Sequence, residues 1–454
     1  MTSRLFSFAC AGFLLLALLV GGATREEVIA PDIVGLLSLP LLGWAVWRLR
    51  DRPPEQPERL VFAILAGCFL VGLIQLIPLP PGLWTALPGR APIVADLAAA
   101  GLVPGWAPIS LKPQATVSAL LCLIPAAALF LSLRTLDQAG RRRLVLLIFG
   151  VGVASAVVGG LQVIGGSDSP LRFYAVTNPD PAVGFFSNRN HLASLFVCLV
   201  PFAALEALEA AARRPAGRVR IVLMLALILL AAAGVAMTQS RAGALLLGLS
   251  LLGAAAMAWR AGLLSSGGKG GGGRTILAGG VLLLALAAIG GPVIFGGVLD
   301  RVGGGLDTEI RIPAAQIAGG AALTYAPFGS GLGSFVPVYM MHETPTSMQN
   351  TYVNHAHDDW LELLVETGLL GAAVMIAFLA WFARASLRAW RRRHGSGGAG
   401  ARAASLVIGL LLAHSLVDYP LRTPAMMCLF ALACGLMLAP RVASGAAPAD
   451  PADL

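Results

Sequence analysis

The chain has 454 residues, of which 57% are hydrophobic and only 12% are charged, and its mean hydropathy is +0.80. This composition is too apolar for a soluble domain of ordinary kind and indicates a polytopic membrane protein. The formal net charge of +9 is explained by membrane topology and does not require a nucleic-acid partner.

Long apolar runs predict an all-α fold of about twelve transmembrane helices, because about 20 apolar residues cross roughly 30 Å of hydrocarbon. The first run follows Arg4 and could also be a signal peptide, but we expect it to be retained as a helix. All six cysteines fall within the runs, where we expect packing residues and not disulfide partners. The predicted spans are residues 5–22, 28–47, 60–79, 115–133, 144–164, 191–211, 219–239, 242–259, 276–299, 360–381, 403–417 and 424–440.

The positive residues set the predicted orientation, because loops rich in Lys and Arg remain in the cytoplasm. With both termini inside, 23 of the 32 Lys and Arg residues fall in cytoplasmic segments. We therefore predict that the N- and C-termini are cytoplasmic.

Three segments between the spans stand out, together with the C-terminal tail. Residues 265–275 and 391–402 are rich in glycine and are expected to be flexible linkers. An external stretch of nearly sixty residues, between Asp300 and His357, is too long for a simple connector. It contains a predicted helix over 308–323, followed by the turn-forming segment PFGSGLGSF. We predict spans one to nine in 1–299, a long external loop in 300–357, spans ten to twelve in 358–440, and a disordered cytoplasmic tail in 441–454.

Polar clusters outside the basic loops all fall on the external side in this topology. Five separate stretches on one face predict one site there. They are SNRNH (187–191), QSRAG (239–243), EIRIP (309–313), HAHDD (355–359) and DYPLRTP (418–424).

The HAHDDWLE segment opens the tenth span. Asp359 and Glu362 fit a capping box, with Asp359 as N-cap. His357 would then lie just before a helix N-terminus, whose partial positive charge favours the neutral imidazole that a general base requires. Two other interpretations remain open: the histidines simply solvate a helix start, or His355 and His357 ligate a metal with the carboxylates. A metal site would need further ligands from distant His191 or His342.

Arg241 and Arg311 are candidates for holding phosphate, because guanidinium is permanently charged and can bind it in bidentate fashion. The alternative for a lone arginine in a short turn is that it reaches the lipid headgroups. For the weaker candidates Arg189, Arg301 and Arg422, headgroup contact is the expected role.

These residues resemble the O-antigen ligase and polymerase superfamily of bacterial envelope glycan assembly. The resemblance rests on FFSNRNHLAS, TQSRAG, Arg311 followed by PFGSGLGSF, and HAHDDWLELLVETGLLG, which occur in the family's order. QLIPLPPGLW (75–84) also resembles the N-terminal half of its members. The likeness extends over most of the chain, from the third span to the twelfth.

The resemblance implies a GT-C-like glycosyltransferase of the bacterial inner membrane with a periplasmic active site. Its members transfer a glycan from an undecaprenyl-diphosphate carrier to an acceptor hydroxyl, either on lipid A core (ligase) or on another carrier-linked chain (polymerase). It implies that His357 is the general base, that Arg241 and Arg311 hold the diphosphate, and that no metal or cofactor is needed. His355 is expected to orient acceptor or base and Glu362 to cap the helix. His191, Arg189, Asp359, Arg301 and Arg422 are secondary candidates.

The chain departs from the family's pattern at two positions. The usual His-Asn-Asp is here His357-Asp358-Asp359, and an aromatic residue that commonly follows the loop arginine is replaced by Ile312. We expect the first change to affect acceptor recognition or the charge state of the histidine.

Two alternative classes of protein are a transporter and a glycan-binding scaffold. A lipid or glycan transporter also needs many spans, but coupled transporters usually keep ionisable residues near the midplane, and these span interiors are almost free of charge. A glycan-binding scaffold would not need a histidine at a helix start beside arginines.

Overall fold

The computed structural model describes residues 2–25, 28–50, 56–213, 216–262, 306–345, 348, 353–391 and 398–438. The side chains of residues 2–3, 56–57 and 306–312 are outside this description. The predicted ninth span, the linker 265–275, the tail 441–454 and Arg301 also lie outside the described residues.

The described residues form fifteen α-helices and one 3-10 helix, with no strand among them, so the predicted all-α fold is confirmed. Eight helices are long and apolar enough to cross a membrane, and three shorter apolar helices coincide with the first and the last two predicted spans. Together these are α1 (Thr2–Val20), α2 (Ala30–Leu49), α3 (Gln56–Gln75), α6 (Pro113–Thr135), α7 (Gln138–Gly165), α8 (Arg189–Ala211), α9 (Arg218–Thr238), α10 (Arg241–Arg260), α14 (Asp359–Arg391), α15 (Ala399–His414) and α16 (Pro424–Met437).

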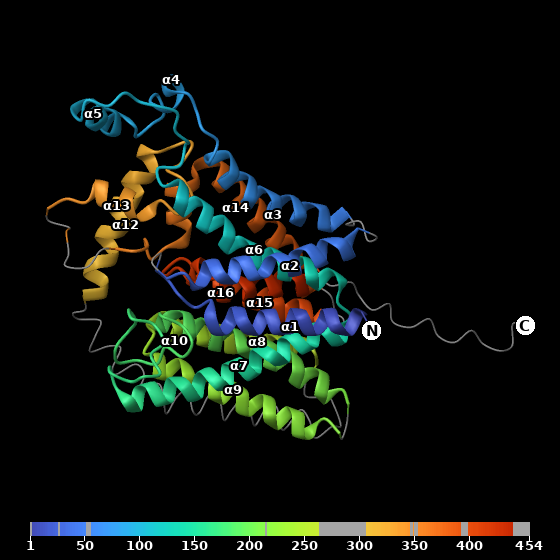
Figure 1. Ribbon diagram of the computed structural model, residues 1–454. Coiled ribbons are helices and arrows are strands. Elements are labelled where there is room, and N and C mark those ends of the chain that lie inside the picture. Colours follow the sequence, from blue (N-terminus) through green and yellow to red (C-terminus); the bar gives the residue numbers. More distant parts are fainter. Residues whose placement is uncertain are drawn as a thin grey trace, which may run out of the picture.

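The spanning helices run side by side, and the four remaining α-helices of the described residues lie together at one end of them, which we call the loop end (Figure 1). The predicted helix over 308–323 is confirmed by one of these four helices. They are α4 (Pro81–Trp84), α5 (Ala91–Ala99), α12 (Leu306–Thr324) and α13 (Phe335–His342).

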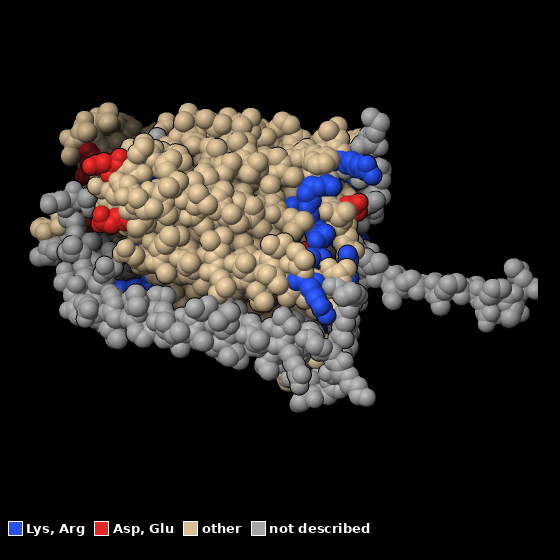
Figure 2. All heavy atoms as spheres, turned by 90° about the horizontal axis from the view of Figure 1, so that it is seen from below, with Lys and Arg blue, Asp and Glu red and all other residues tan. Residues whose placement is uncertain are grey.

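Charge is distributed unequally between the two ends. Figure 2 shows that most Lys and Arg side chains on the displayed face lie at the end opposite to the loop end, which we call the basic end. There Arg142 and Arg220 both pair with Glu206, and Arg134 pairs with Glu58. Between the two ends the described residues of the displayed face show no Lys, Arg, Asp or Glu side chains (Figure 2), as expected for a surface that faces lipid.

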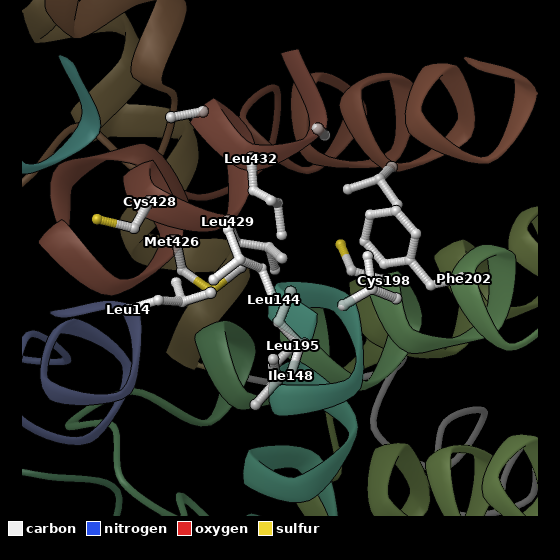
Figure 3. Close-up of a cluster of buried hydrophobic side chains, with 14 of the residues drawn as sticks. Leu14, Leu144, Ile148, Leu195, Cys198, Phe202, Met426, Cys428, Leu429 and Leu432 are labelled. Atoms are coloured by element: carbon white, nitrogen blue, oxygen red, sulfur yellow. The ribbon is translucent and has the colours of Figure 1, made fainter. Parts of the chain in front are cut away.

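The core is made of apolar side chains from helices that are far apart in the sequence. Leu144 and Ile148 of α7, Leu195 of α8 and Leu429 of α16 are all buried in one cluster (Figure 3). Cys198 and Cys428 are buried in it as free thiols, which confirms the packing role predicted for them.

Helix α14 is interrupted at Gly368, whose φ of 58° and ψ of −146° are not helical. The segment PFGSGLGSF fills this break: Leu369 N–H donates to Pro327 O, and Gly331 N–H donates to Glu366 O. Gly329, Gly331 and Gly333 all have positive φ, so the turn predicted from these glycines is confirmed. The interruption thus anchors the long loop to α14 close to the residues of HAHDD.

Candidate active site

The start of α14 differs by one residue from the expected capping box. Asp358, not Asp359, is the N-cap: its Oδ1 accepts hydrogen bonds from Trp360 N–H (2.9 Å) and Leu361 N–H (3.1 Å). Glu362 reaches back to Ala356 N–H (2.8 Å) instead of the N-cap, so the capping box prediction was wrong. Because Asn and Asp cap helices equally well, the Asp358 that departs from the family pattern keeps a capping side chain.

His357 precedes this cap in a left-handed conformation, with φ of 54°, which is uncommon outside glycine. Its Nδ1 is buried, has no hydrogen-bond partner among the described residues and lies 3.7 Å from Asp418 Oδ1, too far for a hydrogen bond but close enough for a charge interaction. Asp418 is fully buried and is fixed by Asn190, whose side-chain amide donates to its Oδ2. Burial opposes ionisation of Asp418, but the neighbouring histidines, His357 first, hold its pKa well below the ordinary value. A carboxylate facing Nδ1 favours the tautomer that leaves the lone pair on Nε2.

Tyr419 is the centre of the site. Its ring lies 5.0 Å from that of His357, 4.2 Å from that of His355 and 5.3 Å from that of His191, between ring centroids. Asn188 and Asn354 lie at its hydroxyl oxygen, at 3.3 and 3.5 Å. Tyr419 therefore connects SNRNH, HAHDD and DYPLRTP, three of the five polar stretches expected to converge.

His355 has two partners that can only accept hydrogen bonds. Its Nδ1 lies 2.8 Å from Glu362 Oε1 and its Nε2 lies 3.1 Å from Thr24 O. Both ring nitrogens must donate, so the ring carries a positive charge. Burial by itself would lower the pKa of His355, but the Glu362 carboxylate raises it above the ordinary value. A charged His355 cannot accept a proton, which leaves His357 as the histidine of HAHDD able to act as a base.

Arg422 closes the other side of the site. It lies in the 3-10 helix η2 (Pro420–Arg422) and contacts Asp359 (3.3 Å), Glu362 (3.4 Å) and Glu366 (2.8 Å). Burial would lower the pKa of Arg422, but these carboxylates raise it. The expected contact of Arg422 with lipid headgroups was therefore wrong, because its guanidinium is engaged in a buried ion-pair cluster.

The remaining predicted residues are placed as follows. Arg241 is the first residue of α10, whose N-cap Ser240 accepts from Gly243 N–H. Arg189 opens α8 in the same way after the N-cap Asn188. Arg311 lies within α12, but its side chain is outside the description. His191 is fully buried, and neither of its ring nitrogens has a hydrogen-bond partner among the described residues. The structure thus joins His355, Asp359, Glu362 and Arg422 directly. It links His357 to them through Tyr419 and leaves the roles of Arg241 and Arg311 as predictions.

Several residues of the site were not predicted from the sequence. Asp418, Tyr419 and Asn190 belong to the polar stretches DYPLRTP and SNRNH, but their partners lie more than 60 residues away in the chain. Glu366 could have been found, because it continues the face of Asp359 and Glu362 at helical spacing. Thr24 offers only a backbone carbonyl, for which the sequence carries no signal.

Within the described residues, no group of three or more His, Cys, Asp or Glu side chains has the geometry of a metal site. Both ring nitrogens of His355 already hydrogen-bond to protein atoms, Glu362 Oε1 and Thr24 O. A cavity of about 590 Å³ begins instead at this polar cluster, where His355, Glu362, Glu366 and Arg422 line one end of it.

One comparison with known proteins gives a match. Residues 225–376 match the family model described as O-Antigen ligase. Over this segment, about a third of the chain, the protein is similar to O-antigen ligases. The matched segment contains Arg241, Arg311 and the HAHDD segment, while Asp418 and Arg422 lie beyond its C-terminal limit. The resemblance to the O-antigen ligase and polymerase superfamily is confirmed, and no curated protein matches the chain.

Proposed function

We propose that the protein is an inverting membrane glycosyltransferase of O-antigen ligase type. It transfers a glycan from an undecaprenyl-diphosphate carrier to an acceptor hydroxyl, with lipid A core as the acceptor in a ligase and a carrier-linked glycan in a polymerase. The observation that supports it most is the pair formed by His357 and the buried Asp418 at the start of α14. The O-antigen ligase domain around His357 adds independent support.

The proposed reaction uses His357 as general base. Nε2 takes the proton of the acceptor hydroxyl, and the Asp418 carboxylate, 3.7 Å from Nδ1, stabilises the imidazolium that forms. The acceptor oxygen bonds to the anomeric carbon of the donor sugar from the face opposite the carrier. The bond from that carbon to the diphosphate oxygen breaks, and its electron pair leaves with undecaprenyl diphosphate. The new glycosidic bond therefore has inverted configuration.

We propose that Arg241 and Arg311 bind the carrier diphosphate. Both lie at the loop end, Arg241 at the start of α10 and Arg311 in α12. Arginine charge can stabilise the negative charge that develops on a leaving diphosphate, which is already a good leaving group. In this proposal a divalent cation is not required.

The proposed orientation places the basic end in the cytoplasm and the loop end in the periplasm of the bacterial inner membrane. The unequal charge of the two ends supports this assignment (Figure 2). It puts His357 and the ion-pair cluster of Arg422 at the periplasmic face. A transporter is a weaker proposal, because the site described here lies at the helix ends and not at the middle of the bundle.

The test is product analysis with purified protein in nanodiscs, in the presence of EDTA. Undecaprenyl-diphosphate oligosaccharide is supplied either alone or with lipid A core. We expect glycan transfer by the wild type, none detectable for His357→Ala, and a loss of roughly 10²-fold or more for Asp418→Asn, because an amide no longer selects the reactive tautomer. Asp180→Asn, at an exposed carboxylate, is the matched control.

The possible outcomes of this experiment test the separate parts of the proposal. Transfer retained by His357→Ala would remove the general base from the proposal. Activity that returned only on addition of manganese or zinc would contradict the metal-free mechanism. Glycan on lipid A core would identify a ligase, and lengthened glycan from the donor alone a polymerase.

A further inference from the structure

A stretch between two spanning helices exposes large apolar side chains at the loop end. Residues 76–109 connect α3 to α6 and contain α4 and α5, and we call them the outer segment. Leu83 and Trp106 are 58% and 70% exposed, and Ile77 is exposed as well. Because water is an unfavourable neighbour for such side chains, their exposure indicates a contact surface.

The outer segment folds back onto the end of α3. Leu79 and Ala107, in the two arms of the segment, exchange backbone hydrogen bonds of 2.9 and 3.2 Å. The indole N–H of the buried Trp84 donates to Gly105 O at 2.7 Å. Trp106, which lies between Gly105 and Ala107, is therefore held close to the point where α3 ends.

This surface continues a face of α3 that meets lipid. Leu70 and Leu73 are exposed within the apolar span of α3, and Ile77 follows them at helical spacing. From there the chain enters the outer segment, whose helices α4 and α5 lie past the end of α3 (Figure 1). Apolar exposure thus extends from the lipid-facing helix onto the segment that follows it.

Charge is nearly absent from the outer segment, whose only ionisable residues are Arg90 and Asp96. Arg90 is buried, donates to Ile109 O and has its guanidinium carbon 5.8 Å from the centre of the Tyr325 ring. Its charge is therefore turned into the protein. Asp96 is exposed on α5, which marks this helix as the part of the segment that faces water.

Gln75, the last residue of α3, joins the outer segment to the break in α14. Its buried side chain donates to Glu366 O (2.7 Å) and Phe328 O (3.2 Å) and accepts from Leu332 N–H (2.9 Å). The side chain of Glu366 pairs in turn with Arg422. The end of α3 that carries the outer segment is thus bonded to PFGSGLGSF and linked through one residue to the ion-pair cluster.

We propose that the outer segment is an interfacial anchor. Ile77, Leu83 and Trp106 rest in the headgroup layer of the leaflet at the loop end, and the membrane thereby fixes the depth of the α14 break. Indole suits this layer, because its ring is apolar and its N–H can donate to headgroup oxygens. A protein partner would be expected to meet a polar rim, whereas here the exposed side chains continue the lipid-facing surface of α3 and the only exposed charge of the segment is Asp96. The anchor does not depend on the proposed reaction.

Depth-dependent quenching tests the anchor. In a variant whose six native cysteines are replaced, Leu83→Cys or Trp106→Cys carries a nitrobenzoxadiazole label, and the protein is placed in nanodiscs. Lipids with a nitroxide at the headgroup or near the start of the acyl chain should reduce the emission about twofold, and iodide in the water should have little effect. Leu70→Cys serves as the hydrocarbon reference and Asp180→Cys, at an exposed carboxylate, as the water reference.

Three results would overturn the anchor. Iodide quenching equal to that of Asp180→Cys, without quenching by nitroxide lipids, would mean that the surface faces water. Protection from both kinds of quencher would mean that protein covers it. Quenching strongest with a nitroxide deep in the acyl chain, as expected for Leu70→Cys, would mean that the segment is embedded in hydrocarbon and not interfacial.

Hydrogen exchange tests the link to α14 and needs no catalysis. Trp106→Asp should weaken the anchor, so the amides of Gly331 and Leu332, which donate to Glu366 O and Gln75 Oε1, should exchange about tenfold faster in nanodiscs. Trp106→Tyr keeps an amphipathic ring and should exchange as the wild type does. Unchanged exchange in Trp106→Asp would contradict the link. A difference between the two variants that was as large in detergent as in a bilayer would show a folding effect and not an anchor.

Discussion

The two histidines of HAHDD, separated by one alanine, are given different chemistry by their partners. His357 faces one carboxylate with one ring nitrogen, so its other nitrogen is available to a substrate. His355 is held between Glu362 and Thr24 through both nitrogens, so it acts as a fixed cation. In the proposed mechanism, proton transfer and electrostatic positioning are thereby divided between neighbouring side chains of the same type.

The charge of His355 predicts a pH-dependent contribution to stability. Its pKa is raised above the ordinary 6.5, so the ion pair with Glu362 contributes fully below about 6.5 and is lost as the pH rises through the folded-state pKa. His355→Gln should therefore cost about 1.5–3 kcal/mol at low pH and progressively less at higher pH. The measurement is the unfolding temperature of wild type and variant in detergent between pH 5.5 and 9.

A double-mutant cycle with Glu362→Gln assigns this effect to the pair. We expect a coupling energy between His355 and Glu362 that follows the same pH profile. A difference between wild type and His355→Gln that grew with pH would mean that the ring is neutral in the folded protein. In that case His355 would be a second candidate for the base.

Helix α14 carries the end of the HAHDD segment and also contacts the long loop, because it is interrupted at Gly368. A Cβ on this glycine would lie 2.2 Å from Pro327 O, and its φ of 58° with ψ of −146° is a conformation that almost only glycine adopts. We expect Gly368→Ala to destabilise the protein by about 2–3 kcal/mol and to reduce transfer, because Glu366 and the loop segment would shift together. Thermal unfolding and the product assay measure the two effects.

Gly150→Ala in α7 is the matched control for this substitution. Gly150 is helical and has open space around the position of a Cβ, so alanine should leave stability unchanged or improve it slightly. If Gly368→Ala unfolded at the same temperature as Gly150→Ala, the interruption of α14 would not be a structural requirement.

The sequence predicted these elements far better than their contacts. Apolar run length is a local property, so the helices that cross the membrane and the helix near 308–323 could be located. The N-cap was assigned one residue late, because Asp358 and Asp359 are equally suited to capping. The side chain of Asp359 is instead held by Ser415, Leu421 and Arg422, which lie far along the chain. The pairing of His357 with Asp418 has the same cause: it depends on how α14 and α15 are placed, which no local pattern records.

At the scale of the whole molecule, all the proposals depend on which end of the bundle faces the periplasm. Leu102 is exposed between α5 and α6 at the loop end, and Ala139 is exposed at the start of α7 beside the arginines of the basic end. In a variant whose six native cysteines are replaced, Leu102→Cys should react with a membrane-impermeant maleimide in intact spheroplasts. Ala139→Cys should react only after the membrane is permeabilised.

The reverse labelling pattern would place His357 and the ion-pair cluster of Arg422 in the cytoplasm. Substrates displayed on the outer leaflet could not then reach the site, and the glycosyltransferase proposal would fail together with the orientation. With the expected pattern, the proposed diphosphate site and the proposed base both face the leaflet in which carrier-linked glycans are presented. The positive charges of the basic end then fix the topology, and charged residues of the loop end, Arg422 and its carboxylate partners among them, build the site.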